Sequence, residues 1–253
     1  FQHMLAPMID SRFNSYGTNK AKIIRVPQSN SSLKFESEME SRMSRNFWLS
    51  ESLSDALEEM KSFRDAWHGQ CNFTLHYPGL IEKLRNENYD GAFSEPVCMC
   101  GFALFNLIGI KNYAISLSIS SSEGTFDSSG APSFPSYIPS TLGIHGERMS
   151  FFERLHNLFN HLAVNLFYPG IRDPFDEMFR QRFGKEAKGV DAILRNSSFY
   201  FVNAEPLIDF PKMLTHKVID IGGISVSSGH NPINETWSSI LNKRNKTVLI
   251  SFG

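Results

Sequence analysis

The chain has 253 residues, 41% of them hydrophobic and 20% charged, which excludes a disordered chain, a coiled coil and a collagen-like fibre. Its 25 basic and 26 acidic residues nearly balance, so it has no electrostatic footprint for nucleic acid. Aromatic residues reach 13%, with 22 Phe, a surplus that suits a thick core or a pocket for apolar ligands. The length suggests one large domain or two small ones.

Short apolar runs alternate with segments of helical periodicity, which predicts an α/β fold with a mainly parallel sheet flanked by helices. The expected strands are Met4–Ile9, Ala21–Val26, Gly91–Ser94, Tyr113–Ile119, Ser198–Val202, Val218–Ile221 and Thr247–Phe252. The expected helices are Ser50–Trp67, Tyr77–Asn86, Val97–Ile108, Met149–Phe167, Pro174–Phe183 and Val190–Arg195. No internal repeat or low-complexity tract interrupts them.

The helix from Met149 has the clearest pattern. Its apolar residues keep one stripe, whereas polar residues such as Asn157 fall outside it, and Pro169 with Gly170 should end it. The stripe consists of Phe151, Leu155, Leu158, Phe159, Leu162 and Leu166. Before this helix, the long Pro- and Gly-containing segment 120–147 predicts a loop that covers a ligand or is disordered.

The cysteines and the glycosylation sequons bear on the compartment. The chain has 3 cysteines and no C-x-x-C motif, so we expect neither a disulfide framework nor a zinc site. The N-x-[ST] sequon, in contrast, occurs at Asn30, Asn72, Asn196, Asn234 and Asn245. Together these sequons favour a lumenal or secreted glycoprotein, although each one alone is a weak match.

The familiar catalytic signatures are absent: there is no G-x-G-x-x-G, P-loop, H-E-x-x-H or G-x-S-x-G motif. His156 and His161 point about 140° apart on one helix, so they cannot share a metal, and no metal site is predicted. Cys98 and Cys100 begin an apolar helix, where cysteine mostly behaves as a small hydrophobic residue.

Glu95 is the acid that stands out. It follows the expected strand Gly91–Ser94 and precedes Pro96, at the edge of an open parallel sheet where ligands bind. A carboxylate there could orient a histidine and stabilise its charged form, as in triad chemistry. The position fits equally well an acid that stabilises a helix N-terminus.

Six runs of residues resemble the UDP-glucuronosyltransferase family of UDP-glycosyltransferases, in order and in spacing, and their residues are most similar to the invertebrate, nematode-like branch. The first run, DGAFSEPVCMCGF from Asp90, is similar to the segment around the acid that orients the family's catalytic histidine. The others are PSYIPS from Pro135 with MSFFERLHN from Met149, ILRNSSFYFVNAEPLIDFP from Ile193, KVIDIGGI from Lys217 and VLISFG from Val248. The resemblance covers nearly the whole chain.

The resemblance implies the N-terminal, acceptor-binding half of a GT-B enzyme, with a Rossmann-like domain at 1–242. Residues 243–253 would be the first strand of the UDP-sugar-binding domain, with Gly253 at the start of a donor loop. The implied reaction is inverting transfer of glucuronic acid or another hexose from a UDP-sugar, which is a co-substrate and not a cofactor, to a small lipophilic hydroxyl acceptor. It also implies a detoxification enzyme on the lumenal side of the endoplasmic reticulum membrane, anchored by a C-terminal span, with self-association left open.

By the same resemblance, Glu95 matches the histidine-orienting acid, although the vertebrate pattern has Asp there. Met4–Ile9 resembles the second strand of the family, so the catalytic histidine would lie upstream of Phe1, and His3 is no substitute. We therefore expect a fragment that is inactive by itself. The alternative function is a non-catalytic module of Rossmann-like fold that binds a small molecule.

The acceptor pocket is expected just beyond the carboxyl ends of the strands and along the loop and helix that follow. The residues predicted to line it are Cys98, Ser118, Ser120, Phe126, Phe134 and Phe151. For each aromatic residue by itself, packing in the core is the simpler expectation.

Overall fold

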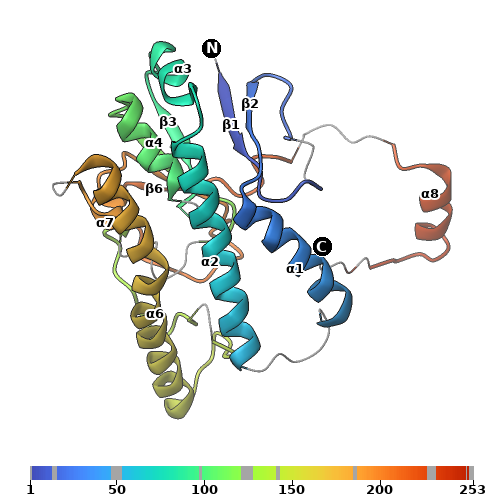
Figure 1. Cartoon of the computed structure of the whole chain (residues 1–253). Helices are drawn as coiled ribbons and strands as arrows, with labels where there is room; N and C mark the ends of the chain where they lie inside the picture. Colours follow the sequence, from blue (N-terminus) through green and yellow to red (C-terminus); the bar gives the residue numbers. More distant parts are fainter. Residues whose placement is uncertain are drawn as a thin grey trace. The chain divides into compact units, whose positions relative to one another are not determined.

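The structure is a computed structural model that describes residues 2–12, 16–46, 53–96, 99–120, 128–140, 143–184, 187–226, 232–248 and 250. The chain divides into two compact units, Phe1–Gly222 and Gly223–Gly253. The first unit contains every strand of the described part of the chain (Figure 1). In the second, the short helix α8 (Glu235–Leu241) begins at Asn234, whose side chain accepts a hydrogen bond from the Trp237 amide at 2.9 Å.

The first unit is α/β, as predicted, with parallel strands flanked by helices. The strands are β1 (His3–Pro7), β2 (Lys22–Val26), β3 (Ala92–Ser94), β4 (Tyr113–Leu117), β5 (Tyr200–Val202) and β6 (Val218–Asp220). The helices are α1 (Asn30–Asn46), α2 (Leu53–Leu75), α3 (Leu80–Asn86), α4 (Cys100–Ile108), α6 (Phe151–Phe183) and α7 (Val190–Arg195). Six of the seven expected strands are confirmed within a few residues.

The larger sheet has the order β3-β4-β5-β6, and all its pairs are parallel. On one face, the central side chains Ile115 and Tyr200 are almost completely buried. On the opposite face, Phe93 is 74% exposed, and Phe201 and Ile219 are only partly covered. Parallel sheets normally carry helices on both faces, so this face is bare in the part of the chain that is described.

The smaller sheet consists of β1 and β2 alone, paired in parallel with His3 opposite Lys22 and Pro7 opposite Val26. No ladder joins β1 to β3 in the described structure. Side chains bridge the two sheets instead: His3 Nδ1 lies 2.5 Å from the hydroxyl of Tyr89, just before β3. One edge of β1 and one edge of β3 therefore have no strand partner among the described residues.

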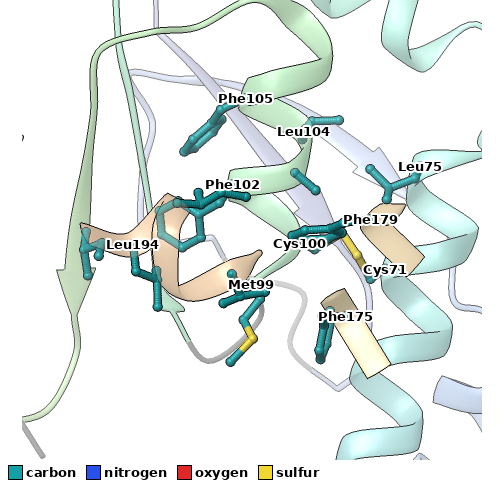
Figure 2. Packing of buried hydrophobic residues seen from close by; sticks show 14 of the residues in the cluster. Cys71, Leu75, Met99, Cys100, Phe102, Leu104, Phe105, Phe175, Phe179 and Leu194 are labelled. Atoms are coloured by element: carbon teal, nitrogen blue, oxygen red, sulfur yellow. A yellow bond between two sulfur atoms is a disulfide. The ribbon is translucent and has the colours of Figure 1, made fainter. Parts of the chain in front are cut away.

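The core lies between the buried face of the larger sheet and the helices α2, α4, α6 and α7. Figure 2 shows Phe102 and Phe105 of α4 together with Phe175 and Phe179 of α6 in this cluster. The Phe102 ring packs on Tyr113 of β4, with 5.9 Å between the ring centroids. Gly101 allows α4 to approach β3 closely, since a Cβ atom at this position would come within 2.3 Å of Ser94 Oγ.

Helix α6 departs from the sequence prediction in its length. It runs for 33 residues from Phe151 to Phe183 and contains both Pro169 and Pro174, where we expected two helices separated by Pro169. Each proline removes a backbone donor and costs helix stability. The buried side chains of the second half, Phe175 and Phe179 among them, hold the helix in register with the core and outweigh this cost.

The orientation of the first half of α6 is also unexpected. Its apolar stripe faces solvent, with Phe151 and Leu166 mostly exposed, whereas the polar Asn157 is fully buried. The prediction of core packing for Phe151 is therefore wrong. Periodicity alone shows that a helix has an apolar face, and it does not show what covers that face.

Two further differences concern the helices and the end of the chain. The helices α1 and α8 were not predicted, and α2 extends to Leu75 rather than Trp67. Of the expected strand Thr247–Phe252, the described residues 247, 248 and 250 are not in a strand; the others lie outside the described residues.

A disulfide joins Cys71 near the end of α2 to Cys100 at the start of α4, with 5.4 Å between the Cα atoms (Figure 2). Both residues are buried in the core. We expected no disulfide, and this was wrong for this pair: Cys100 is more than a small hydrophobic residue. The pairing could not be read from the sequence, since the two cysteines are 29 residues apart and meet only through the packing of α2 on α4.

Replacing both Cys71 and Cys100 by Ala should lower the free energy of unfolding by about 3–4 kcal/mol, because the cross-link closes a loop of this length in the unfolded chain. Denaturant titration of the variant and of the parent chain would measure the loss. The Cys98→Ala variant is the matched control and should unfold like the parent. Equal stability of the double variant and the parent would contradict a formed disulfide.

Candidate active site at the carboxyl edge of the larger sheet

The carboxyl ends of β3, β4 and β5 bring three polar side chains together. Glu95, Ser118 and Asn203 are the first residues after these three neighbouring strands. The backbone amide and the hydroxyl of Ser118 both donate hydrogen bonds to Glu95 Oε1, at 3.1 and 2.5 Å. The side-chain amide of Asn203 donates to the backbone oxygen of Ser118 at 2.9 Å. The predicted site residues Glu95 and Ser118 are thus in direct contact.

Ser120, also predicted, lies in a second polar group at the same edge. Its hydroxyl donates to Asp209 Oδ2 at 2.7 Å, and the Lys212 ammonium donates to both Ser120 Oγ and Asp209 Oδ2 at 3.0 Å. Burial works to raise the pKa of Asp209, but the hydrogen bonds from Ser120 and Lys212 outweigh it and lower the pKa. Asp209 therefore stays ionised, and it holds Ser120 and Lys212 together.

Asp220, at the end of β6, shows the opposite trend. Burial, and next the negative charge of Asp209, raise the pKa of Asp220. At the carboxyl edge, the ionised form of Asp209 is therefore stabilised by Ser120 and Lys212, whereas the ionised form of Asp220 is disfavoured by burial and by the charge of Asp209. Sequence reasoning missed Asn203, Asp209, Lys212 and Asp220, although Asn203 and Asp209 lie within the run that begins at Ile193 and Asp220 lies within the run that begins at Lys217.

The aromatic residues predicted for the acceptor pocket have other surroundings. Phe134 is half-buried and stacks on Tyr137, with 5.5 Å between the ring centroids. Phe151 is exposed and its ring contacts Phe152. Cys98, Phe126 and Gly253 lie outside the described residues. The acceptor-binding role of this group stays a prediction.

Asn157 organises the segment that leads into α6. Its Oδ1 accepts a hydrogen bond from the Ser140 amide at 2.8 Å, and its Nδ2 donates to the carbonyl oxygens of Pro135 and Ile138 at 2.7 and 2.8 Å. The PSYIPS run is thereby fixed to the last residue of the MSFFERLHN run. One buried side-chain amide thus joins the two sequence runs in the structure.

The start of α6 is fixed by a capping box and a histidine pair. Ser150 and Glu153 cap the helix reciprocally, and the Ser150 hydrogen bonds lower the pKa of Glu153. His156 Nδ1 lies 2.7 Å from His145 Nε2, and His161 Nε2 lies 3.3 Å from Asn165 Nδ2. His156 and His161 thus have different hydrogen-bond partners, His145 and Asn165.

A cavity of about 270 Å³ lies beside the middle of α6, and none of the predicted site residues within the described ranges lines it. Its lining residues are Ser128, Asn165, Tyr168, Pro169, Arg172, Asp191 and Arg195. Burial, followed by the charge of Asp191, raises the pKa of Tyr168 to about 12. The Arg172 guanidinium is paired with Asp191 at 2.6 Å. The lining residues of this cavity do not include Glu95, Ser118 or Asn203.

With an α/β fold and a polar cluster at the carboxyl edge of parallel strands, the chain has the organisation of a Rossmann-like domain. Comparison of its sequence with known families gives a match to "UDP-glucoronosyl and UDP-glucosyl transferase" over residues 3–253. The chain belongs to this family, and the resemblance described above is confirmed.

Individual relatives agree with the family match at low identity. The chain is 28% identical to ugt-48 of Caenorhabditis elegans over 76% of its length and 36% of that protein. It is 24% identical to UDP-glucuronosyltransferase 1A4 of Oryctolagus cuniculus over 79% of its length and 37% of that protein. The same identity holds for human UDP-glucuronosyltransferase 1A3, over 74% and 34%. The chain spans about a third of the length of these relatives.

Replacing Asn157 by Ala should lower the free energy of unfolding by about 2–4 kcal/mol. The substitution would leave the Ser140 amide and the carbonyl oxygens of Pro135 and Ile138 without hydrogen-bond partners and would open a cavity. Chemical denaturation would measure the change. Asn160→Ala on the same helix is the matched control and should have a much smaller effect. If both variants lose the same stability, the Asn157 hydrogen bonds are not what fixes the 135–140 segment.

Proposed function

We propose that residues 1–242 are the acceptor-binding half of an inverting UDP-glycosyltransferase, and that residues 243–253 lead into its UDP-sugar-binding domain. The observation that carries this proposal is the family match over 3–253. The donor is UDP-glucuronic acid or another UDP-hexose, and the acceptor is a small lipophilic alcohol or phenol. The donor sugar is a co-substrate, so the reaction uses no separate cofactor.

In the proposed reaction, a histidine accepts the proton of the acceptor hydroxyl while the oxygen attacks the anomeric carbon. The bond from this carbon to the UDP oxygen breaks, UDP leaves with the electron pair, and the configuration inverts. Glu95 stabilises the imidazolium that forms, as the acid of a catalytic triad does. Its place at the carboxyl edge, beside Ser118, supports this role.

The catalytic histidine belongs, on this proposal, to a strand and turn that precede residue 1 in the complete protein. The edges of β1 and β3 that have no strand partner among the described residues support this assignment, because a parallel strand between them would join the two sheets into one. Alternate strands of a sheet are about 9.6 Å apart, a distance that two long side chains such as His3 and Tyr89 can bridge. His3 contacts Tyr89 and Glu87, and on this proposal the catalytic histidine is another residue.

We further propose that the protein works on the lumenal side of the endoplasmic reticulum as a membrane-anchored glycoprotein that detoxifies small molecules. Disulfides persist in oxidising compartments, so the Cys71–Cys100 bond supports this location. The asparagines of all five sequons are exposed. Among the described helices, none is long and apolar enough to cross a membrane; the proposed anchor is a C-terminal span beyond residue 253.

In the complete transferase, Glu95→Gln should lower turnover on the order of a hundredfold, with a much smaller effect on acceptor binding, because the amide cannot stabilise the imidazolium. Glu95→Asp should be milder, since it keeps the charge and shortens the reach. UDP release with a phenolic acceptor would measure both, and the separate 253-residue chain should release none. Turnover at the parent rate in the Gln variant would reduce Glu95 to an acid that stabilises a helix start.

When the chain is expressed with a signal peptide in a secretory cell, at least two of the five sequons should carry glycans. Treatment with an endoglycosidase should then increase the mobility of the protein on a gel. A variant with Gln at all five asparagines is the control and should migrate like the treated protein. Mobility that the enzyme does not change would remove the support that the sequons give to a lumenal location.

A further inference from the structure

We propose that Ser118 and Asn203 are positioning residues that tether the Glu95 carboxylate by one oxygen and leave the other for the histidine. This inference rests on the proposed function of Glu95. It deepens that function by assigning the contacts that set the direction of the carboxylate.

The tether is concentrated on a single oxygen. The Ser118 amide and hydroxyl both donate to Glu95 Oε1, at 3.1 and 2.5 Å, and hydrogen bonds to a carboxylate are stronger than those between neutral groups. Within the described ranges, Oε2 has no hydrogen-bond donor, so this oxygen remains available to a partner. A carboxylate that orients a histidine needs this arrangement, with one oxygen fixed and the other unoccupied.

Asn203 holds the serine in turn. Its side-chain amide donates to the Ser118 carbonyl oxygen at 2.9 Å, and its backbone amide donates to the Leu117 carbonyl oxygen at 3.1 Å. The chain at the end of β4 is therefore fixed from β5 on one side, while it holds Glu95 after β3 on the other. The pairing of three neighbouring strands therefore fixes the position of the Glu95 carboxylate.

The tether also suits the length of the Glu95 side chain. This side chain has one more rotatable bond than an aspartate would have, and fixing it costs more conformational entropy. Two donors on Oε1 offset this cost and limit the positions that Oε2 can take. Without them, the extra methylene would let the carboxylate leave the line to the histidine.

The test uses the complete transferase, with UDP release measured for a phenolic acceptor across pH. Ser118→Ala should lower kcat roughly tenfold, a part of the assistance that an oriented base provides, and leave the acceptor KM within about twofold. The acid limb of kcat/KM should move to lower pH, because a carboxylate that is no longer aimed at the imidazolium stabilises it less and the pKa of the histidine falls. Ser118→Thr keeps the hydroxyl and should restore the parent values.

A double-mutant cycle separates positioning from other roles. In the Glu95→Gln background, Ser118→Ala should have little further effect, because the carboxylate it positions is already gone. Asn203→Ala should shift kcat and the pH profile in the same direction as Ser118→Ala, and it provides a second test if that variant does not fold. Ser37→Ala, on the exposed surface of α1, is the matched control.

The outcomes distinguish this inference from the proposed function. If Glu95→Gln impairs turnover but Ser118→Ala and Asn203→Ala leave kcat and the pH profile unchanged, only the tether is overturned. If Ser118→Ala raises KM alone, Ser118 is an acceptor contact and not a positioning residue. If Glu95→Gln turns over like the parent, or the complete protein releases no UDP, the proposed function itself fails.

Discussion

The burial of one face of the β3–β6 sheet under α4, α6 and α7 is the constraint on which the first unit depends. Tyr200 and Ile115 on the sheet, and Phe175 and Phe179 on α6, are almost completely buried in one cluster. The burial of these side chains compensates for the two prolines within α6, so the helix continues through them. It also places the start of α4 against the end of β3. The residues that follow the strands, Glu95 and Ser118 among them, meet because their strands are locked in this layer.

The sequence was most informative where local pattern and tertiary packing agree. The strands β1 to β6 were predicted within a few residues, because short β-branched and aromatic runs between turns have few alternatives in an α/β chain. The contact between Glu95 and Ser118 also follows from this pattern, since the carboxyl ends of neighbouring parallel strands share one edge. Predicting that these two residues lie at one site requires only the positions where the strands end, and it does not require the geometry of the side chains.

The errors arose where packing overrides local preference. Periodicity identified the apolar stripe of α6, but it gave no sign that Asn157 would turn inward to bind three backbone groups of a distant loop. Pro169 was expected to end the helix because its cost is local, whereas the compensating burial of Phe175 depends on the whole fold. The Cys71–Cys100 bond and the Ser120–Asp209 hydrogen bond likewise join parts of the chain whose proximity no spacing rule provides.

The open edges of β1 and β3 have a practical consequence for work with the chain in isolation. An unpaired edge is a template for pairing with another molecule, and here it lies beside the bare sheet face that carries Phe93. Copies of the separate 253-residue chain would meet through these surfaces, so their hydrodynamic size and solubility would depend on concentration. Any edge mutation that reduces such self-association would therefore report on the solubility of the 253-residue chain, and not on the thermodynamic stability of its fold.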